Sequence, residues 1–159
     1  MPSPAATFIA LANVLNRSLP LSFHMSDAGG QSSAYNVVLQ TLRLKSPKLH
    51  DHLTTKIPTL EPDMYLNRVF MSLFTGQLAI DEASRLWDVY VFEGDALLVR
   101  AAIALLLRVE MALLGCRNPK EVQLAITAQS SGGSKVPAVA ELGVEDKFMK
   151  AVREAGKRD

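Results

Sequence analysis

The chain has one cysteine, Cys116, among its 159 residues, and neither sign of charge is in excess. A single cysteine cannot form a disulfide within the chain, so a reducing, intracellular setting is expected. With 17 basic and 16 acidic residues, the chain has a formal net charge of +1. It therefore lacks the strongly basic character of proteins that bind nucleic acids or anionic membranes. We therefore expect no nucleic-acid partner.

The chain also lacks a charge-free hydrophobic run of membrane-spanning length. Residues 96–114 are apolar and long enough to span a bilayer, but they include two arginines and a glutamate, which are costly inside lipid. Residues 5–15 are apolar as well, yet no basic segment precedes them, as a signal peptide requires. The sequence predicts a soluble protein without an integral membrane segment, in which residues 96–114 form a core helix.

Strand patterns and linkers are missing too. Hydrophobic residues make up 48% and charged residues 21% of the chain, a globular composition, and the length suits one domain with one core. Apolar residues recur three and four positions apart, which is typical of helices, and no segment alternates as a strand does. The sequence therefore predicts an all-α domain.

Prolines, glycines and capping residues predict where the helices begin and end. Ser3-Pro4 favours the start of a first helix that carries apolar residues from Phe8 to Leu15. Pro20 and the group Asp27–Gly30 favour a break after it. Further helices are expected as follows: one carrying Tyr35 to Leu42 and ending before Ser46-Pro47, one from Pro47 to about Thr54, one carrying Tyr65 to Phe74 with Gly76 just past its end, one beginning at Asp81, one from Asp95 to about Gly115, one from Pro119 to Thr127, and one from about Gly143 to Arg153. Residues 129–136, rich in Gly and Ser, are expected to form a flexible loop.

The stretch RLWDVYVFEGD, residues 85–95, joins two of these expected helices. Glu93-Gly94-Asp95 favours a tight corner, in which Gly94 takes a left-handed conformation and Asp95 caps the following helix. Leu86, Trp87, Tyr90 and Val91 are expected to form a buried face, with Trp87 as its anchor. Arg85 and Asp88 can pair with each other or with backbone ends. We interpret the stretch as scaffold, with no catalytic role.

Few residues offer chemistry. His50 and His52 lie two positions apart, so on a helix they point in different directions and do not easily share a metal ion. Cys116 is expected to serve in packing. A small hydrolase using Cys116 and a histidine is the weakest hypothesis, because no nucleophile–base pair can be named. Neither a metal nor a cofactor is expected.

Residues 65–106 resemble the C-terminal part of the TBC domain of Rab GTPase-activating proteins. The resemblance rests on several motifs that occur in family order: Tyr65, the pair Leu73-Phe74, the R-x-W-D segment Arg85, Trp87 and Asp88, and the corner Glu93-Gly94-Asp95 before an apolar helix. Leu49 through Leu53, followed by Pro62 and Tyr65, is similar to the family's P-x-L-x-x-H-L … P-x-x-Y stretch. Residues 5–27 look like the helix and loop after the family's catalytic glutamine. The nine motif residues named first, from Tyr65 to Asp95, are expected to be structural rather than catalytic.

The resemblance implies a fold and a function. TBC domains are all-helical, so residues 1–115 are expected to form a multi-helix orthogonal array like the C-terminal lobe of that domain, with residues 116–159 as terminal helices and a Gly/Ser loop packed on it. The family accelerates GTP hydrolysis on Rab proteins with an arginine finger and a glutamine finger. The expected partner is therefore a small GTPase of the Rab family, and the expected location is cytoplasmic or peripheral on endomembranes.

The chain departs from the family where the chemistry lies. The family's I-x-x-D-x-x-R and Y-x-Q motifs do not occur, and Arg85 matches the structural R-x-W-D segment instead of the finger. The chain is thus expected to be a regulator and not an enzyme by itself. Two explanations stay open: a fragment of a full activator, or a shortened homologue that binds without activating.

A lobe without its other half has a physical consequence. Helices normally bury an apolar stripe against neighbours, so half of a helical domain is expected to leave an apolar surface uncovered. We expect self-association or partner binding through that surface. The alternative function is a non-catalytic helical adaptor or scaffold for another protein.

Overall fold

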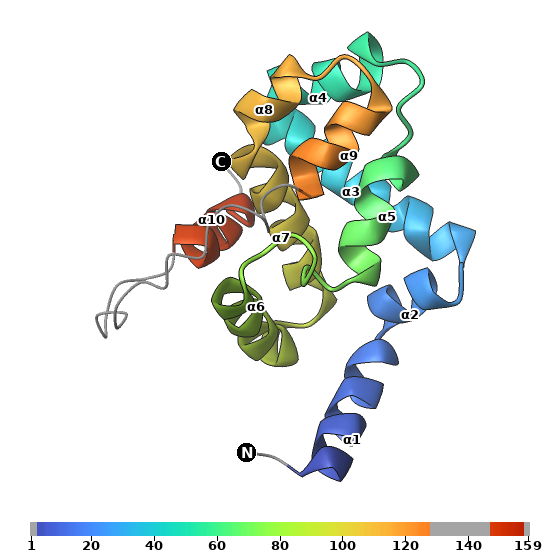
Figure 1. Ribbon diagram of the computed structural model, residues 1–159, viewed down its shortest axis with the longest axis vertical. Helices are drawn as coiled ribbons and strands as arrows, with labels where there is room; N and C mark the ends of the chain where they lie inside the picture. Colours follow the sequence, from blue (N-terminus) through green and yellow to red (C-terminus); the bar gives the residue numbers. More distant parts are fainter. Residues whose placement is uncertain (1–2, 128–146, 158–159) are drawn as a thin grey trace.

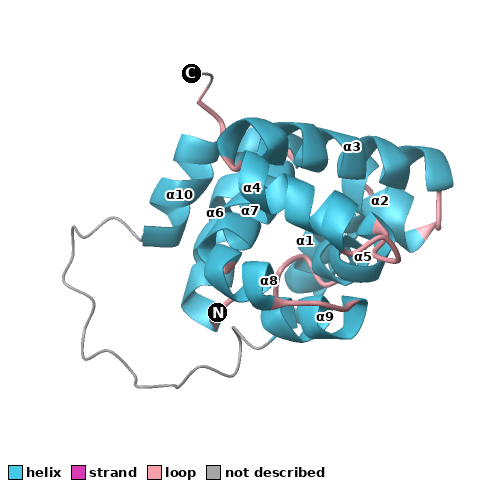
Figure 2. Ribbon diagram, turned by 90° about the horizontal axis from the view of Figure 1, so that it is seen from above, coloured by secondary structure: helices cyan, strands magenta, loops and turns pink. Residues whose placement is uncertain are grey.

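The structure is a computed structural model that describes residues 3–127 and 147–157. These residues form helices and no strand, which confirms the predicted all-α fold (Figures 1 and 2). No helix among them combines the length and apolar character needed to cross a membrane. In chain order the elements are α1 (Pro4–Leu15), α2 (Ser18–His24), α3 (Ala28–Lys45), α4 (Pro47–Asp51), a π-helical turn η1 (His52–Lys56), α5 (Pro62–Met71), α6 (Ile80–Glu93), α7 (Asp95–Arg108), α8 (Glu110–Gly115), α9 (Pro119–Thr127) and α10 (Lys147–Ala155).

Helix α7 lies at the centre of the fold and contacts α3, α5, α6, α8 and α10 (Figure 1). It buries eight consecutive or nearly consecutive residues, from Leu97 to Leu106, including three alanines that let neighbouring helices approach closely. Helix α10 packs against α7 through Phe148 and Val152, the face predicted for it. The expected core helix at residues 96–114 is thus largely this central helix.

Helix α1 begins as predicted, and only its last residues, Val14 and Leu15, pack against the core. The Ser3 hydroxyl accepts a hydrogen bond from the Ala6 N–H at 3.2 Å, and Pro4 occupies the first helical position. No residue of α1 is buried. The helix contacts α2 at its base and projects from the body at the bottom of Figure 1.

The predicted break at Pro20 is wrong, because α2 runs through it. Pro20 stands in the first turn of α2, where backbone N–H groups have no partner within the helix, so the missing N–H costs little. The break comes later, at Asp27, whose carboxylate accepts hydrogen bonds from Gly29 and Gly30 and caps α3. A side chain at Gly30 would come within 2.6 Å of Ser22 Cβ, so the glycine allows α3 to lie close to α2.

The end of α5 also differs from the prediction. Its apolar stripe, from Tyr65 to Phe74, is buried as expected. The chain leaves the helix before Gly76, at Leu73 and Phe74, which take positive φ values of 46° and 69°. Phe74 N–H donates to the Val69 carbonyl at 3.1 Å, so the chain turns back under the helix and both side chains enter the core. Burial of the two side chains offsets their strained backbone.

Two predicted helices are interrupted. The helix expected from Asp95 to Gly115 breaks at Val109, where ψ is 12°, into α7 and α8. The first residue of α8, Glu110, accepts a hydrogen bond from the Ser46 hydroxyl at 2.6 Å, which holds α8 against the start of α4. The helix expected from Pro47 to Thr54 is α4 followed by η1.

The C-terminal helices pack on the rest of the lobe. Helix α9 covers the predicted range and contacts α5 and α8, and α10 begins at Lys147. The predicted loop at 129–136 and the predicted helix start at Gly143 lie outside the described residues.

Candidate functional site

The corner between α6 and α7 is built on Gly94. Its φ of 76° and ψ of −161° lie in a region that only glycine adopts without strain. The positive φ was expected, whereas the extended ψ was not. Helix α6 therefore ends at Glu93 and α7 begins at Asp95, with a single residue between them.

Asp95 does not cap its own helix, as the sequence had led us to expect. No side chain caps the start of α7. The Asp95 carboxylate instead accepts a hydrogen bond from the Leu19 N–H at 2.8 Å, in the first turn of α2, and another from the Tyr90 hydroxyl at 2.8 Å. Burial and the neighbouring carboxylate raise the pKa of Tyr90, so its hydroxyl keeps the proton that it donates.

Arg17 completes the corner from the opposite direction. Its guanidinium donates hydrogen bonds to the carbonyls of Tyr90 at 3.3 Å and Val91 at 2.8 Å, and its Cζ lies 4.8 Å from the centre of the Tyr90 ring. These carbonyls belong to the last turn of α6, where orphan acceptors and the negative end of the helix dipole favour a cation. Arg17 and Asp95 thus tie the α1–α2 junction to the α6–α7 corner. Sequence reasoning missed Arg17, since nothing local marks it.

Trp87 connects α6 to the turn after α5. Its side chain is half-buried, and Nε1 donates a hydrogen bond to the Leu73 carbonyl at 3.0 Å. Leu73 is one of the two residues with positive φ, so this bond satisfies a carbonyl in the irregular turn.

Arg85 and Asp88 lie on the solvent side of α6. Both are exposed, and across the described ranges no hydrogen bond or ion pair joins them to each other or to another residue. The ion pairs of this region involve neighbouring residues instead. Glu82 pairs with Arg108 of α7, with both carboxylate oxygens within 3.0 Å of Nη1, and Glu93 pairs with Arg100.

Two large apolar side chains share this exposed side of α6. Val91, expected in the core, is 53% exposed, and Phe92 is 89% exposed. They follow Arg85 and Asp88 at helical spacing, so the four side chains form one stripe, here called the α6 face. Leu86 and Tyr90 occupy the opposite, buried side as expected.

The two candidate histidines lie in different surroundings, and His52 contacts the backbone of Cys116. His50 Nδ1 lies 3.3 Å from the Asp51 carboxylate, whereas His52 is buried and its Nε2 lies 2.9 Å from the Cys116 carbonyl. Cys116 is buried, and its thiol donates to the Ala112 carbonyl. Burial raises the pKa of the Cys116 thiol, and Glu121 raises it further, so the reactive thiolate is disfavoured. Within the described parts, no three metal-binding side chains gather.

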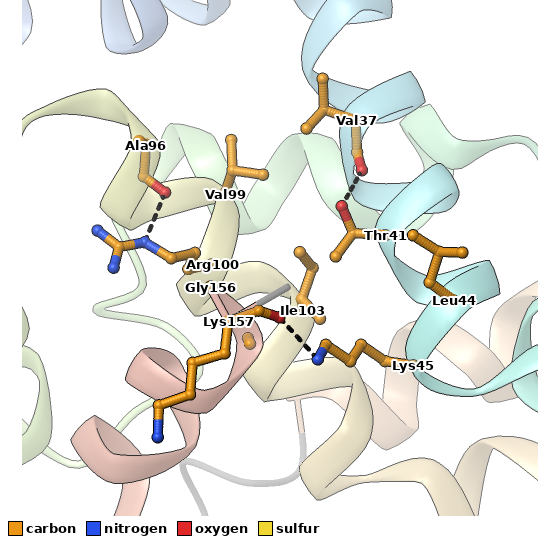
Figure 3. Close-up of a pocket in the computed structure, with 11 residues that line it drawn as sticks. Val37, Thr41, Leu44, Lys45, Ala96, Val99, Arg100, Ile103, Gly156 and Lys157 are labelled. Atoms are coloured by element: carbon orange, nitrogen blue, oxygen red, sulfur yellow. Dashed lines mark hydrogen bonds between the residues drawn. The ribbon is translucent and has the colours of Figure 1, made fainter. Parts of the chain in front are cut away.

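A large hollow among the described residues is an apolar groove between α3 and α7, bordered at one end by the residues after α10 (Figure 3). It has a volume of about 950 Å³. A second hollow of about 280 Å³ extends it toward α2 and shares Val37, Ala96 and Val99 with it. We call the two together the α3–α7 groove; it contains no nucleophile–base pair.

Comparison with known proteins finds a family whose domain covers most of these helices. The family model of the Rab-GTPase-TBC domain matches residues 1–114, from the start of the chain to the end of α8. The chain belongs to this family. The TBC match thus covers the corner, the α6 face and the central helix, and it ends before α9.

Relatives in the family are similar over the same part. The chain is 33% identical over 110 residues to TBC1 domain family member 12 of Xenopus tropicalis, covering 69% of this chain and 16% of the relative. It is 33% identical over 102 residues to TBC1 domain family member 14 of Bos taurus, covering 64% and 14%. A TBC domain-containing protein of Schizosaccharomyces pombe is 31% identical over 99 residues, covering 62% and 21%. The chain therefore spans a small part of the length of these TBC proteins. No solved structure matches it.

Proposed function

We propose that this chain is a Rab-binding lobe of the TBC family that recognises a Rab GTPase through the α6 face and does not by itself accelerate GTP hydrolysis. Family membership connects the chain to the regulation of Rab GTPases. The proposal adds the surface that makes the contact and the absence of catalysis. A Rab partner would also bring the chain to the surface of endomembranes.

The lack of both finger motifs supports the second part. Accelerating phosphoryl transfer requires an arginine that reaches the transferring group and a glutamine that positions water. Three arginines of the lobe are engaged with its own helices: Arg17 with α6 carbonyls, Arg100 with Glu93 and Arg108 with Glu82. Arg85 is exposed, but it stands in the R-x-W-D segment and not in the family's finger motif.

The observation that carries the proposal is the exposed α6 face. Among the described residues, Arg85 and Asp88 form no hydrogen bond or ion pair within the chain. Phe92 is 89% exposed, whereas the phenylalanines of α2 and α5 are buried. Protein interfaces are enriched in aromatic residues and arginine, and the α6 face contains one of each. The base of the face is rigid, because Arg17 holds the α6 terminus. The backbone that carries this end of the stripe is therefore already ordered before binding.

Binding to a panel of purified Rab proteins, each loaded with GDP or with a GTP analogue, tests the first part. At least one Rab is expected to bind, with a preference for the GTP-analogue state. Phe92→Ala and Arg85→Ala are each expected to weaken binding about tenfold or more. Leu124→Ala, an exposed change on α9, is the matched control and is expected to leave binding unchanged.

The outcomes separate the alternatives. Unchanged binding by both α6 variants would place the contact elsewhere. Capture of a non-Rab protein, with no nucleotide-dependent Rab binding, would favour the adaptor function. A GTP hydrolysis assay over the same panel is expected to show no acceleration, and acceleration would contradict the non-catalytic part of the proposal.

A further inference from the structure

The apolar helix α1 packs against the core only through its last turn, where Val14 and Leu15 are half-buried. Phe8 is 72% exposed, Ile9 is 59% exposed and Leu11 is 43% exposed, and no residue of the helix is buried. Its sequence, PAATFIALANVL, contains no charged residue. Surface helices normally place charged and polar residues on their outer side, so the composition of α1 is that of a helix covered by protein.

The helical state of α1 also calls for a partner. It has 12 residues, and isolated helices of about this length are only marginally stable in water. The Ser3 cap contributes some stability, but tertiary packing supplies most of what a helix needs. Contact with α2 at the base leaves the three large side chains uncovered.

The α3–α7 groove offers a matching surface. Its walls include Val37 and Leu44 of α3, which are 47% and 80% exposed, and Val99 and Ile103 of α7 (Figure 3). Such a hollow between two helices suits an apolar helix laid along it.

One end of the groove carries the cationic side chains of Lys45 and Arg100, but these do not favour an acidic ligand. Lys45 Nζ donates to the Lys157 carbonyl at 2.9 Å, and Arg100 is paired with Glu93 and donates to the Ala96 carbonyl. These cations are used by the chain itself, so the apolar wall is the feature that selects an occupant.

The positions of helix and groove point to a second copy of the chain. The groove begins at Ser18 and Leu19, immediately after α1, and runs past α3 and α7 toward the residues after α10. Helix α1 leaves the same place and projects away from the body (Figure 1). A two-fold axis near residue 17 would turn α1 of each copy toward the body of the other, an exchange of an identical element between protomers. We propose that the chain forms a symmetric dimer by reciprocal docking of α1 into the α3–α7 groove.

The exposed area is sufficient for such a dimer. The exposed fractions of Phe8, Ile9, Leu11, Val37 and Leu44 add up to about three whole residues, an upper limit of about 600 Å² if each is given the area of an aromatic side chain. Reciprocal docking covers at most this area on both copies, about 1,200 Å² in total, which reaches the lower end of the size expected of a specific interface. The proposal does not depend on Rab recognition, because the α6 face is not part of it.

Sedimentation equilibrium of the 159-residue chain over a wide concentration range tests the proposal. A monomer–dimer equilibrium is expected. Phe8→Glu on α1 and Leu44→Glu in the groove are each expected to weaken dimerisation by about a hundredfold, since each places a charge in an apolar contact twice per dimer. Both side chains are exposed in one copy, so both variants are expected to fold. Met111→Glu, at an 83% exposed position on α8, is the matched control and is expected to dimerise normally.

Mixing the two variants gives the decisive result. A chain with Phe8→Glu and a chain with Leu44→Glu can form one intact contact. In it, the unaltered α1 of the Leu44→Glu chain lies in the unaltered groove of the Phe8→Glu chain. Both glutamates of a heterodimer fall in its other contact, which either one already breaks, so heterodimers are expected in the mixture at concentrations where neither variant dimerises alone. A monomer at all concentrations would overturn the proposal. So would a dimer that Leu44→Glu leaves intact, because that result would mean that α1 packs against α1 or against another surface.

Discussion

The Asp95 carboxylate lies 2.8 Å from the Leu19 backbone nitrogen, so the first turn of α2 is capped by a residue of α7 that is 76 positions later in the chain. The same carboxylate accepts the Tyr90 hydroxyl, and Arg17, just before α2, binds the end of α6. One acidic and one basic residue thus hold three helix ends together. This cluster fixes the α6 face relative to α1 and the groove.

Replacing Asp95 with Ala is expected to lower the free energy of unfolding by about 2 to 3 kcal/mol. The change removes a helix cap and leaves the Tyr90 hydroxyl and Leu19 N–H without their partner. Urea unfolding followed by circular dichroism measures the loss. Asp88→Ala, at an exposed position on α6, is the control and is expected to change stability by less than about 0.5 kcal/mol. Equal effects of the two changes would contradict the capping role.

Gly94→Ala is expected to destabilise the chain by about 1 to 3 kcal/mol. The cost arises in the backbone, because a side chain at φ 76° and ψ −161° is strained. A Cβ there would lie 3.4 Å from Arg17 Nη1, an ordinary contact, so crowding adds little. Gly115→Ala offers a comparison, since a Cβ at Gly115 meets nothing within 4 Å and φ is not positive there. That change is expected to be neutral or slightly stabilising in thermal unfolding.

Trp87→Phe is expected to cost about 1 to 3 kcal/mol. The substitution keeps an aromatic ring but removes the Nε1 donor, which leaves the Leu73 carbonyl without that bond. Circular dichroism is the suitable probe, because Trp87 is the chain's only tryptophan and the variant loses its fluorescence. Unchanged stability would show that water replaces the indole at the carbonyl.

Tyr65→Phe is expected to alter stability only at alkaline pH. Burial raises the pKa of Tyr65 above its ordinary value of 10.0. The unfolded chain then loses its phenol proton above about pH 10 while the folded chain keeps it, so Tyr65 reduces stability as pH rises, by about 1.4 kcal/mol per pH unit. The variant lacks this loss. Unfolding free energies of the two chains are expected to be similar at pH 7 and to differ in favour of the variant at pH 11.

Cys116 is expected to react slowly with thiol reagents in the folded chain. Its thiol is buried and its pKa is raised, both of which reduce the thiolate that attacks the reagent. Labelling with a chromogenic disulfide in increasing urea is expected to follow the unfolding curve. Complete labelling of the folded chain at the rate of a free peptide thiol would contradict the buried placement.

Local patterns predicted most of the elements. The spacing of Tyr65, Val69 and Phe70 gives one buried stripe, and Ser3-Pro4 gives a helix start, because both depend on neighbours within one or two turns. The errors occurred where a distant contact decided the backbone. Leu73 and Phe74 take positive φ because the core accepts their side chains, and the helix expected to continue past Val109 breaks where Glu110 meets Ser46.

The family was determined by the sequence, through the order of the L-F, R-x-W-D and E-G motifs along residues 73–94, and so was the absence of both finger motifs from the chain. Only the tertiary structure decided what the individual residues do. It turned Asp95 from a cap of its own helix into the cap of α2, recruited Arg17 to the end of α6, and left α1 and the α6 face uncovered. The physical reason is range: helical periodicity is a property of residues a few positions apart, whereas capping across 76 positions and exposure depend on how completed helices pack.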